Sequence, residues 1–166
     1  MKRWWLWGLC ALLPAQMAGA CNLNTHMRAF ELQEGAAPKD APEDTLRTPE
    51  LRVTEVTRGL GGAPGTCDGS GLLGIRLDWP RGDYKLEDIG FEFRVLSAET
   101  SYAVFPAEPV AVVSDSRRAE LLFLWPDAAP GEQKPLRMEV EVRAVTRDYL
   151  RGPPVRLAID STNLDD

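Results

Sequence analysis

The chain has 166 residues, a formal net charge of −6 and a hydrophobic fraction of 44%. That length is enough for one domain with a substantial core. The acidic balance disfavours nucleic acid and anionic lipid as partners, because both attract proteins largely through Lys and Arg. We therefore expect a single globular domain that does not bind nucleic acid.

The first twenty residues resemble an export signal. Lys2 and Arg3 supply a positive start, residues 4–13 form a short apolar core, and three small residues precede Cys21. A signal peptidase cuts after such small residues, and the apolar core is too short to span a membrane, which takes about 20 residues. We predict a signal peptide over 1–20 and a mature chain in the periplasm or outside the cell. Losing two positive charges takes the net charge from −6 to −8.

Two cysteines remain in the mature chain, and they permit two interpretations. In the first, Cys21 and Cys67 form a disulfide, because exported compartments oxidise thiols. The bond would stabilise the fold by about 4 kcal/mol in the chain-entropy model. In the second, Cys21 is the lipidated first residue of a bacterial lipoprotein, because residues 17–20 resemble a loose lipobox. The protein would then be anchored to the membrane through Cys21. We favour the disulfide, and the signal together with the partial lipobox favours a bacterial cell envelope.

Residues 21–48 are predicted to form an N-terminal segment and a linker. The stretch 27–32 is semi-apolar and could add an edge strand to a sheet. The stretch 35–49 is rich in Pro and Ala with scattered charges, and such a composition buries too little apolar surface to repay its ordering. We expect a flexible linker there, followed by a domain over 49–160 and a tail over 161–166.

From Pro49 onward, apolar and polar residues alternate with the period of half-buried strands. Residues 51–56 alternate weakly, whereas 121–125 are apolar throughout and should be buried on both faces or lie under a loop. Gly- and Pro-rich turn signals separate the stretches, and no helical stripe occurs. The pattern predicts an all-β, antiparallel β-sandwich. The clearest inward positions are Leu73, Ile75, Leu77 and Trp79; Ile89, Phe91, Phe93 and Val95; Met138, Val140, Val142 and Ala144; and Val155, Leu157 and Ile159.

Several of these stretches resemble a fibronectin type III domain. Residues 73–80 end in Leu-Asp-Trp-Pro and are similar to that family's second strand, where a buried Trp precedes a Pro. Residues 91–95 are similar to the third strand and 138–146 to the sixth, and the Gly-Pro-Pro at 152–154 stands where the fold turns into its last strand. The resemblance implies a fibronectin- or immunoglobulin-like sandwich whose loops carry recognition.

The sequence offers little for catalysis. His26 is the single histidine and has no Cys or acidic residue at metal-ligand spacing, so we expect no metal site and no histidine-dependent chemistry. Glu92, Glu139 and Glu141 are the residues that a carboxylate-dependent carbohydrate-active enzyme could use. They alternate with apolar residues beside arginines, which predicts instead a solvated face with cross-strand ion pairs. We expect no enzyme activity and no cofactor.

Aromatic residues in or near the predicted loops form the candidate binding surface: Tyr84, Tyr102, Trp125 and Tyr149. Loop aromatics on a rigid sandwich are common in binding modules. Trp125 closes an apolar run, and for it we favour packing in the core over exposure. The sequence thus predicts an exported, non-catalytic module that binds an unidentified protein or envelope component. It contacts a membrane only if Cys21 is lipidated.

Overall fold

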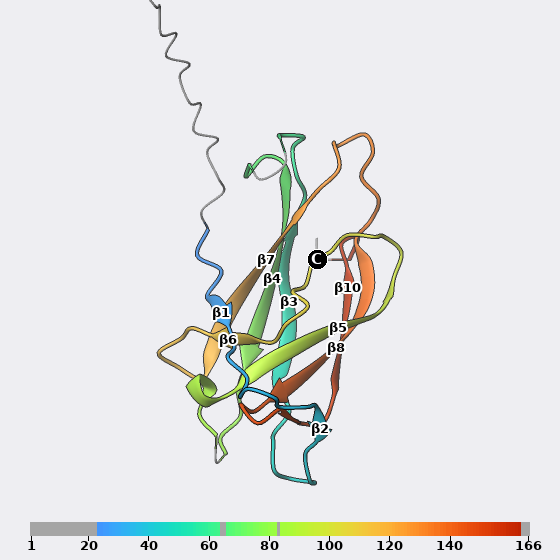
Figure 1. The fold of residues 1–166 in the computed structure, drawn as a ribbon. Helices are drawn as coiled ribbons and strands as arrows, with labels where there is room; N and C mark the ends of the chain where they lie inside the picture. Colours follow the sequence, from blue (N-terminus) through green and yellow to red (C-terminus); the bar gives the residue numbers. More distant parts are fainter. Residues whose placement is uncertain (1–22, 64–65, 83, 164–166) are drawn as a thin grey trace, which may run out of the picture.

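The computed structural model describes residues 23–63, 66–82 and 84–163, so the predicted signal peptide and Cys21 lie outside the described residues. The described chain is nearly all β, in two sheets, with one short 3-10 helix, η1 (Leu86–Asp88) (Figure 1). Across the described ranges, no helix has the length and apolar character that crossing a membrane requires.

The smaller sheet has three strands in the order β3–β4–β7. They are β3 (Glu50–Thr57), β4 (Ser70–Asp78) and β7 (Arg118–Pro126), and both pairs are antiparallel. On β7 the residues at 121, 123 and 125 are buried, whereas those at 122 and 124 are half-buried. Of the two predictions for 121–125, burial on both faces or a position under a loop, burial is therefore complete on the inner face and partial on the outer one.

The larger sheet has the order β1–β6–β5–β8–β9–β2, and β10 also pairs with β8. Its β2–β9 pair is parallel, so the predicted purely antiparallel arrangement is wrong for this short pair. A parallel pair forms here because β2 precedes the sandwich and reaches β9 along a long connection. The strands are β1 (Met27–Ala29), β2 (Lys39–Asp40), β5 (Gly90–Ala98), β6 (Val110–Val112), β8 (Arg137–Val145), β9 (Leu150–Arg151) and β10 (Val155–Asp160).

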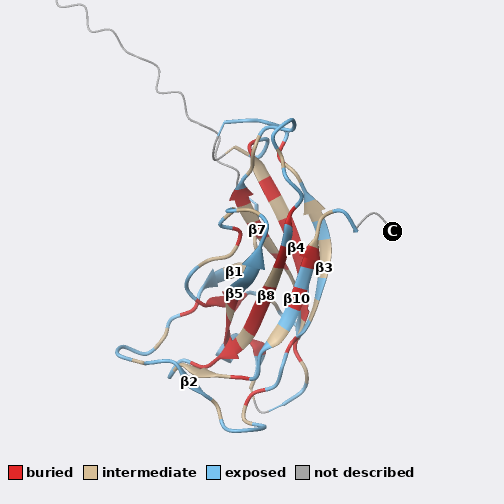
Figure 2. Ribbon diagram, turned by 90° about the vertical axis from the view of Figure 1, so that its right-hand side faces the viewer, coloured by how far each residue is buried: buried red, intermediate tan, exposed pale blue. Residues whose placement is uncertain are grey.

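One core lies between the two sheets, because alternate residues of each sheet turn inward (Figure 2). Phe91, Val140 and Val142 are fully buried, as the alternation predicts. Trp79 is also buried, with its ring edge-on to Phe91 at 5.8 Å and its indole N–H donating to the carbonyl of Tyr84 at 3.0 Å. The all-β prediction is confirmed, and the two-layered arrangement is compatible with a β-sandwich.

Val95 departs from the predicted pattern. It was expected to face the core, but it is 41% exposed. The register between β5 and β8 shifts between Val95 and Ser97. The shift comes after Val95, whose partner Val140 is fully buried, so Val95 lies on the inner face of the sheet and it is its predicted burial that is wrong.

The segment before β3 packs on the domain, so the prediction of a flexible linker is wrong for most of it. Leu46 is only 2% exposed and belongs to the core. The N–H of Ala41 donates to the carbonyl of Arg151 at 2.8 Å, continuing the β2–β9 pairing. The average composition of the segment does not predict this packing, because it depends on a single leucine. Leu46 packs where Gly152 has no side chain, since a Cβ on Gly152 would lie 3.0 Å from the Cβ of Leu46.

The predicted extra edge strand exists as β1, and it belongs to a segment that we call the N-terminal arm (residues 24–32). The arm bridges both sheets on one side of the molecule. The N–H of Leu122 on β7 donates to the carbonyl of Thr25 at 3.2 Å, and the N–H of Val113 beyond β6 donates to the carbonyl of His26 at 2.8 Å. His26 has φ +55°, a left-handed conformation that lets the chain turn from one sheet edge to the other.

Candidate functional site

The structure does not bring the four candidate aromatic residues together. Tyr102 and Trp125 lie at one end of the molecule, with ring centroids 6.3 Å apart. Tyr84 lies in the connection from β4 to β5, and Tyr149 lies between β8 and β9, at the opposite end. They form no common surface.

Trp125 is 1% exposed, so its place in the candidate binding surface was wrong and its packing in the core is confirmed. It packs over Gly71, its cross-strand partner on β4. A Cβ at Gly71 would lie 2.2 Å from the indole ring, so no other residue fits there without rearrangement. The indole therefore supports the strands beneath the loops and does not face a partner.

Tyr149 and Tyr84, at the other end of the molecule, both contact the strands of the domain. Tyr149 has φ +62°, and its hydroxyl donates to Glu92 Oε1 at 3.3 Å. Burial raises the pKa of Tyr149, and the neighbouring charge of Glu92 raises it further. Tyr84 is half-buried against the core and accepts the hydrogen bond from Trp79.

The three candidate glutamates each pair with an arginine, as predicted, but the predicted solvated face is wrong at Glu141, which is buried. Glu141 is only 9% exposed and accepts hydrogen bonds from Arg94 at 2.9 Å and from Arg143 at 3.0 Å. Burial alone raises the pKa of Glu141, but the two arginines outweigh it and hold the pKa below its usual value. A carboxyl held ionised in this way is unsuited to donating a proton at neutral pH. The other two pairs are Glu139 with Arg156 at 3.1 Å and Glu92 with Arg151 at 3.9 Å.

His26 lies on the arm, with its Nδ1 3.0 Å from the carbonyl oxygen of Glu120. Within the described ranges, no group of three or more His, Cys, Asp and Glu side chains is placed to hold a metal ion.

A buried ion pair, which the sequence did not point to, organises the loops near Trp125. Asp127 accepts two hydrogen bonds from Arg58, both at 2.8 Å, and others from the N–H groups of Gly59 and Ala128 at 2.9 Å. The Asp127 side chain is fully buried. Burial alone raises its pKa, but the hydrogen bonds from Arg58 and the backbone outweigh it and lower the pKa to about 2.

Further contacts extend this cluster to the neighbouring loops. Arg58 donates to the carbonyl of Lys134 at 2.6 Å, and its guanidinium lies 5.7 Å from the ring centre of Tyr102. Gln133 donates to the carbonyls of Gly59 and Ala128 at 2.6 and 2.9 Å. We call the segments that these contacts join, residues 58–63 and 127–134, the loop end.

The tips of the loop end are exposed and carry Leu60 and Pro130, with the charged Glu132 beside them. Leu60 is 76% exposed, far more than any other large hydrophobic residue described. Its loop touches the opposing loop, because a Cβ on Gly61 would lie 3.2 Å from the ring of Pro130. Arg58 and Asp127 neutralise each other beneath these tips, so the loop end presents apolar atoms on a rigid base.

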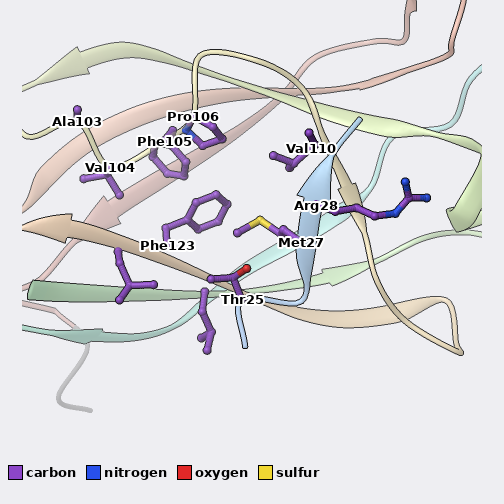
Figure 3. A pocket seen from close by; sticks show the side chains of 12 residues that line it. Thr25, Met27, Arg28, Ala103, Val104, Phe105, Pro106, Val110 and Phe123 are labelled. Carbon is purple, nitrogen blue, oxygen red and sulfur yellow. The ribbon is translucent and has the colours of Figure 1, made fainter. Parts of the chain in front are cut away.

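A second feature is an apolar cavity of about 480 Å³ between the N-terminal arm, β7 and the loop that follows β5 (Figure 3). We call it the edge groove. Phe105 and Phe123 face each other in it, with centroids 4.8 Å apart, and Phe105 also stacks on Phe93 at 5.2 Å. Residues far apart in sequence meet here, so no local pattern could have located the groove. Its lining is Thr25, Met27, Arg28, Ala29, Ala103, Val104, Phe105, Pro106, Val110, Leu122, Phe123 and Leu124.

Comparison with protein-family models, with curated proteins and with solved structures finds no match for this chain. Its candidate sites are therefore the loop end and the edge groove, on the strength of their own geometry.

Proposed function

We propose that the chain is an exported, non-catalytic interaction module of a bacterial cell envelope, built on a fibronectin- or immunoglobulin-like sandwich. In constant-type immunoglobulin domains the first, second, fourth and fifth strands form one sheet, and the third, sixth and seventh form the other. Counted from β3, the first, second and fifth strands here (β3, β4 and β7) form one sheet, and the third and sixth (β5 and β8) lie in the other. The fourth strand, β6, departs from that division, because it pairs with the third. The division of the strands supports a sandwich of this group.

The observation that carries the proposal is the loop end. Binding is weakened by the entropy of ordering loops, and loops fixed beforehand avoid that cost. Asp127, Arg58 and Gln133 fix two loops by hydrogen bonds to their backbone. The same loops display Leu60 to solvent, and binding residues are disproportionately found on loops that a rigid scaffold positions. We infer that the loop end contacts a protein of the envelope.

The direction of the N-terminal arm supports the disulfide between Cys21 and Cys67. The arm runs antiparallel to β7 at Thr25, because Thr25 contacts Leu122 and the next residue contacts Glu120. Followed back from Thr25 towards residue 23, the arm is therefore directed towards the end of β7. That end pairs with Ser70, close in sequence to Cys67. The bond would hold the arm to the loop end.

The mass of the mature protein separates the disulfide from lipidation. We expect a chain beginning at residue 21 whose mass is lower by two hydrogens than the reduced form. A mass increased by a diacylglycerol group would show instead that Cys21 is lipidated and that the protein is an anchored lipoprotein.

The interaction itself is tested by affinity capture from an envelope extract, with the mature protein as bait. We expect specific proteins to bind, and we expect the Leu60→Glu variant to lose them. Val113→Glu is the matched control, because Val113 is also exposed but lies in the connection from β6 to β7. If both variants retain the same proteins as the natural chain, the loop end is not the contact surface. If no envelope protein or glycan binds, the proposed function is wrong.

A further inference from the structure

We propose that the edge groove binds an extended peptide segment of a partner protein, which adds as a strand beside β1. This proposal rests on the proposed function, since it gives an interaction module a second, independent site and names the chemistry of what binds there. The loop end plays no part in it.

The first argument is the free edge of β1. In an antiparallel pair, hydrogen-bonded positions alternate with positions whose backbone groups point away from the partner. His26 and Phe30 are bonded to the β6 side, through Val113 and Pro109 at 2.8 and 3.0 Å. The bonded positions on the arm are therefore 26, 28 and 30. The N–H and C=O groups of Met27 and Ala29 point away from β6.

The second argument is where this free edge lies. The carbonyl of Thr25, just before β1, points away from β6 and accepts from Leu122 on β7, and residues 122–124 of β7 line the groove beside Met27, which Figure 3 shows next to Phe123. Within the described chain, the only backbone pairing of Met27 and Ala29 is their register with β6. Unpaired backbone groups at a sheet edge are a template for another strand, and strand addition is a common way of binding peptides.

The third argument is the chemistry of the lining. The floor and walls are aromatic or aliphatic, from Phe105, Phe123, Val104 and Leu124. Met27 and Ala29 face the same way as their buried partners Val112 and Val110, since cross-strand partners share a face. A strand added beside β1 would place every second side chain against this lining. Those side chains should be apolar.

The fourth argument concerns charge. Arg28 is the charged residue among those that line the groove, and its side chain is exposed and extends away from the cavity (Figure 3). It therefore lies on the outer face of the sheet. An acidic residue directly opposite on an added strand would pair with it across the strands. The groove fits a segment of the form apolar–acidic–apolar.

An acyl chain is the main competing occupant of an apolar groove. It would use the lining but not the backbone groups of Met27 and Ala29, and it would leave Arg28 without a role. A second copy of this chain would use the backbone groups, but it would make the protein dimeric. Both become outcomes of the test.

The test selects peptides from a phage-displayed library of random heptapeptides on the intact mature protein. We expect enrichment of sequences that alternate apolar and acidic residues. The selected peptide, made synthetically, should shift the amide resonances of Met27 and Ala29. The same peptide N-methylated at alternate residues should bind about tenfold more weakly, because it cannot form the backbone hydrogen bonds.

Two variants of one exposed residue probe the groove. Ala29→Pro removes the outward N–H without touching the bonds to β6, and edge strands tolerate proline at such positions. Ala29→Asp places a charge at the mouth of the groove. Each should weaken the peptide by about tenfold, whereas Ala129→Asp, at an exposed alanine of the loop end, should leave the affinity unchanged.

Several results would overturn the proposal. These are the absence of any enriched sequence, peptide binding that is insensitive to both Ala29 variants, tighter binding of palmitate than of peptide, and a dimer that dissociates in Ala29→Asp. Each leaves the proposed function standing if envelope proteins still bind at the loop end. Failure of the capture experiment would instead overturn the proposed function, and a peptide that still binds the groove would show that the two outcomes are separate.

Discussion

Asp127 and Arg58 face each other at the end of the sandwich, with two hydrogen bonds of 2.8 Å between guanidinium and carboxylate. Arg58 follows β3 and Asp127 follows β7, so the pair connects the two edges of the smaller sheet across β4. A buried ion pair stabilises a fold only when further hydrogen bonds satisfy both ions. The N–H groups of Gly59 and Ala128 satisfy the carboxylate here.

This relationship predicts a specific dependence of stability on pH. The pKa of Asp127 is about 2 in the folded protein, against about 3.9 in an unfolded chain. Because the folded pKa is lower, the carboxylate stabilises the fold fully above about pH 4 and loses its contribution as the pH falls towards 2. The expected contribution at neutral pH is about 2–3 kcal/mol.

Urea unfolding of the natural chain and of Asp127→Asn at several pH values measures this contribution. The variant should be less stable at pH 6, and the difference in the free energy of unfolding should shrink between pH 4 and pH 2. A difference that stays constant over that range would mean that Asp127 does not titrate with the fold.

The N-terminal arm should contribute to stability mainly through Phe30. Its buried ring lies over Gly90, where a Cβ would come within 2.5 Å of the ring. Phe30→Ala should cost about 3 kcal/mol of unfolding free energy, and Gly90→Ala about 1–3 kcal/mol through overpacking. In the double variant the new methyl group occupies space that the ring has left. The two costs should therefore be clearly less than additive in a double-mutant cycle, and simple additivity would show that the arm does not pack as described.

The ion pairs on the outer face of the larger sheet should differ widely in their contribution. Removing Glu141 breaks its pairs with Arg94 and Arg143 and leaves the mostly buried Arg143 with the exposed Asp40 as its remaining acidic partner among the described residues, so Glu141→Ala should cost about 3 kcal/mol. Glu139 and Arg156 form a solvent-exposed pair at 3.1 Å, so Glu139→Ala should cost less than about 1 kcal/mol. Thermal or urea unfolding of both variants is the measurement, and equal costs would contradict the role of burial.

The proposed disulfide predicts a large effect of Cys67→Ser. If Cys21 and Cys67 are bonded, the variant should lose about 4 kcal/mol of unfolding free energy under oxidising conditions. Reductant should lower the stability of the natural chain to that of the variant and leave the variant unchanged. A variant as stable as the oxidised natural chain would remove the disulfide and favour lipidation at Cys21.

Much of the fold could be predicted from local pattern. The alternation around Trp79, Phe91, Val142 and Leu157 correctly predicts strands with one buried face. The prediction works because a strand turns successive side chains to opposite faces. Burial of one face therefore appears in the sequence as an alternation of apolar and polar residues. The cross-strand ion pairs followed from the same alternation, since the charged residues occupy the other face.

The candidate sites could not be predicted in this way. For Trp125 the sequence favours the core over the surface, and its burial against Gly71 confirms the core position but removes it from the candidate binding surface. The prediction of a flexible linker is wrong at Leu46, because the average composition of a segment does not show that one of its side chains packs in the core.

The order of residues by itself determined an all-β chain with inward positions on four strands, because burial of a sheet face leaves a period of two. Only the tertiary structure decided that Arg58 meets Asp127, that the arm joins both sheets and that Met27 faces Phe123. These residues are distant along the chain. Their proximity depends on strand order and register, which many interactions across the whole fold fix together.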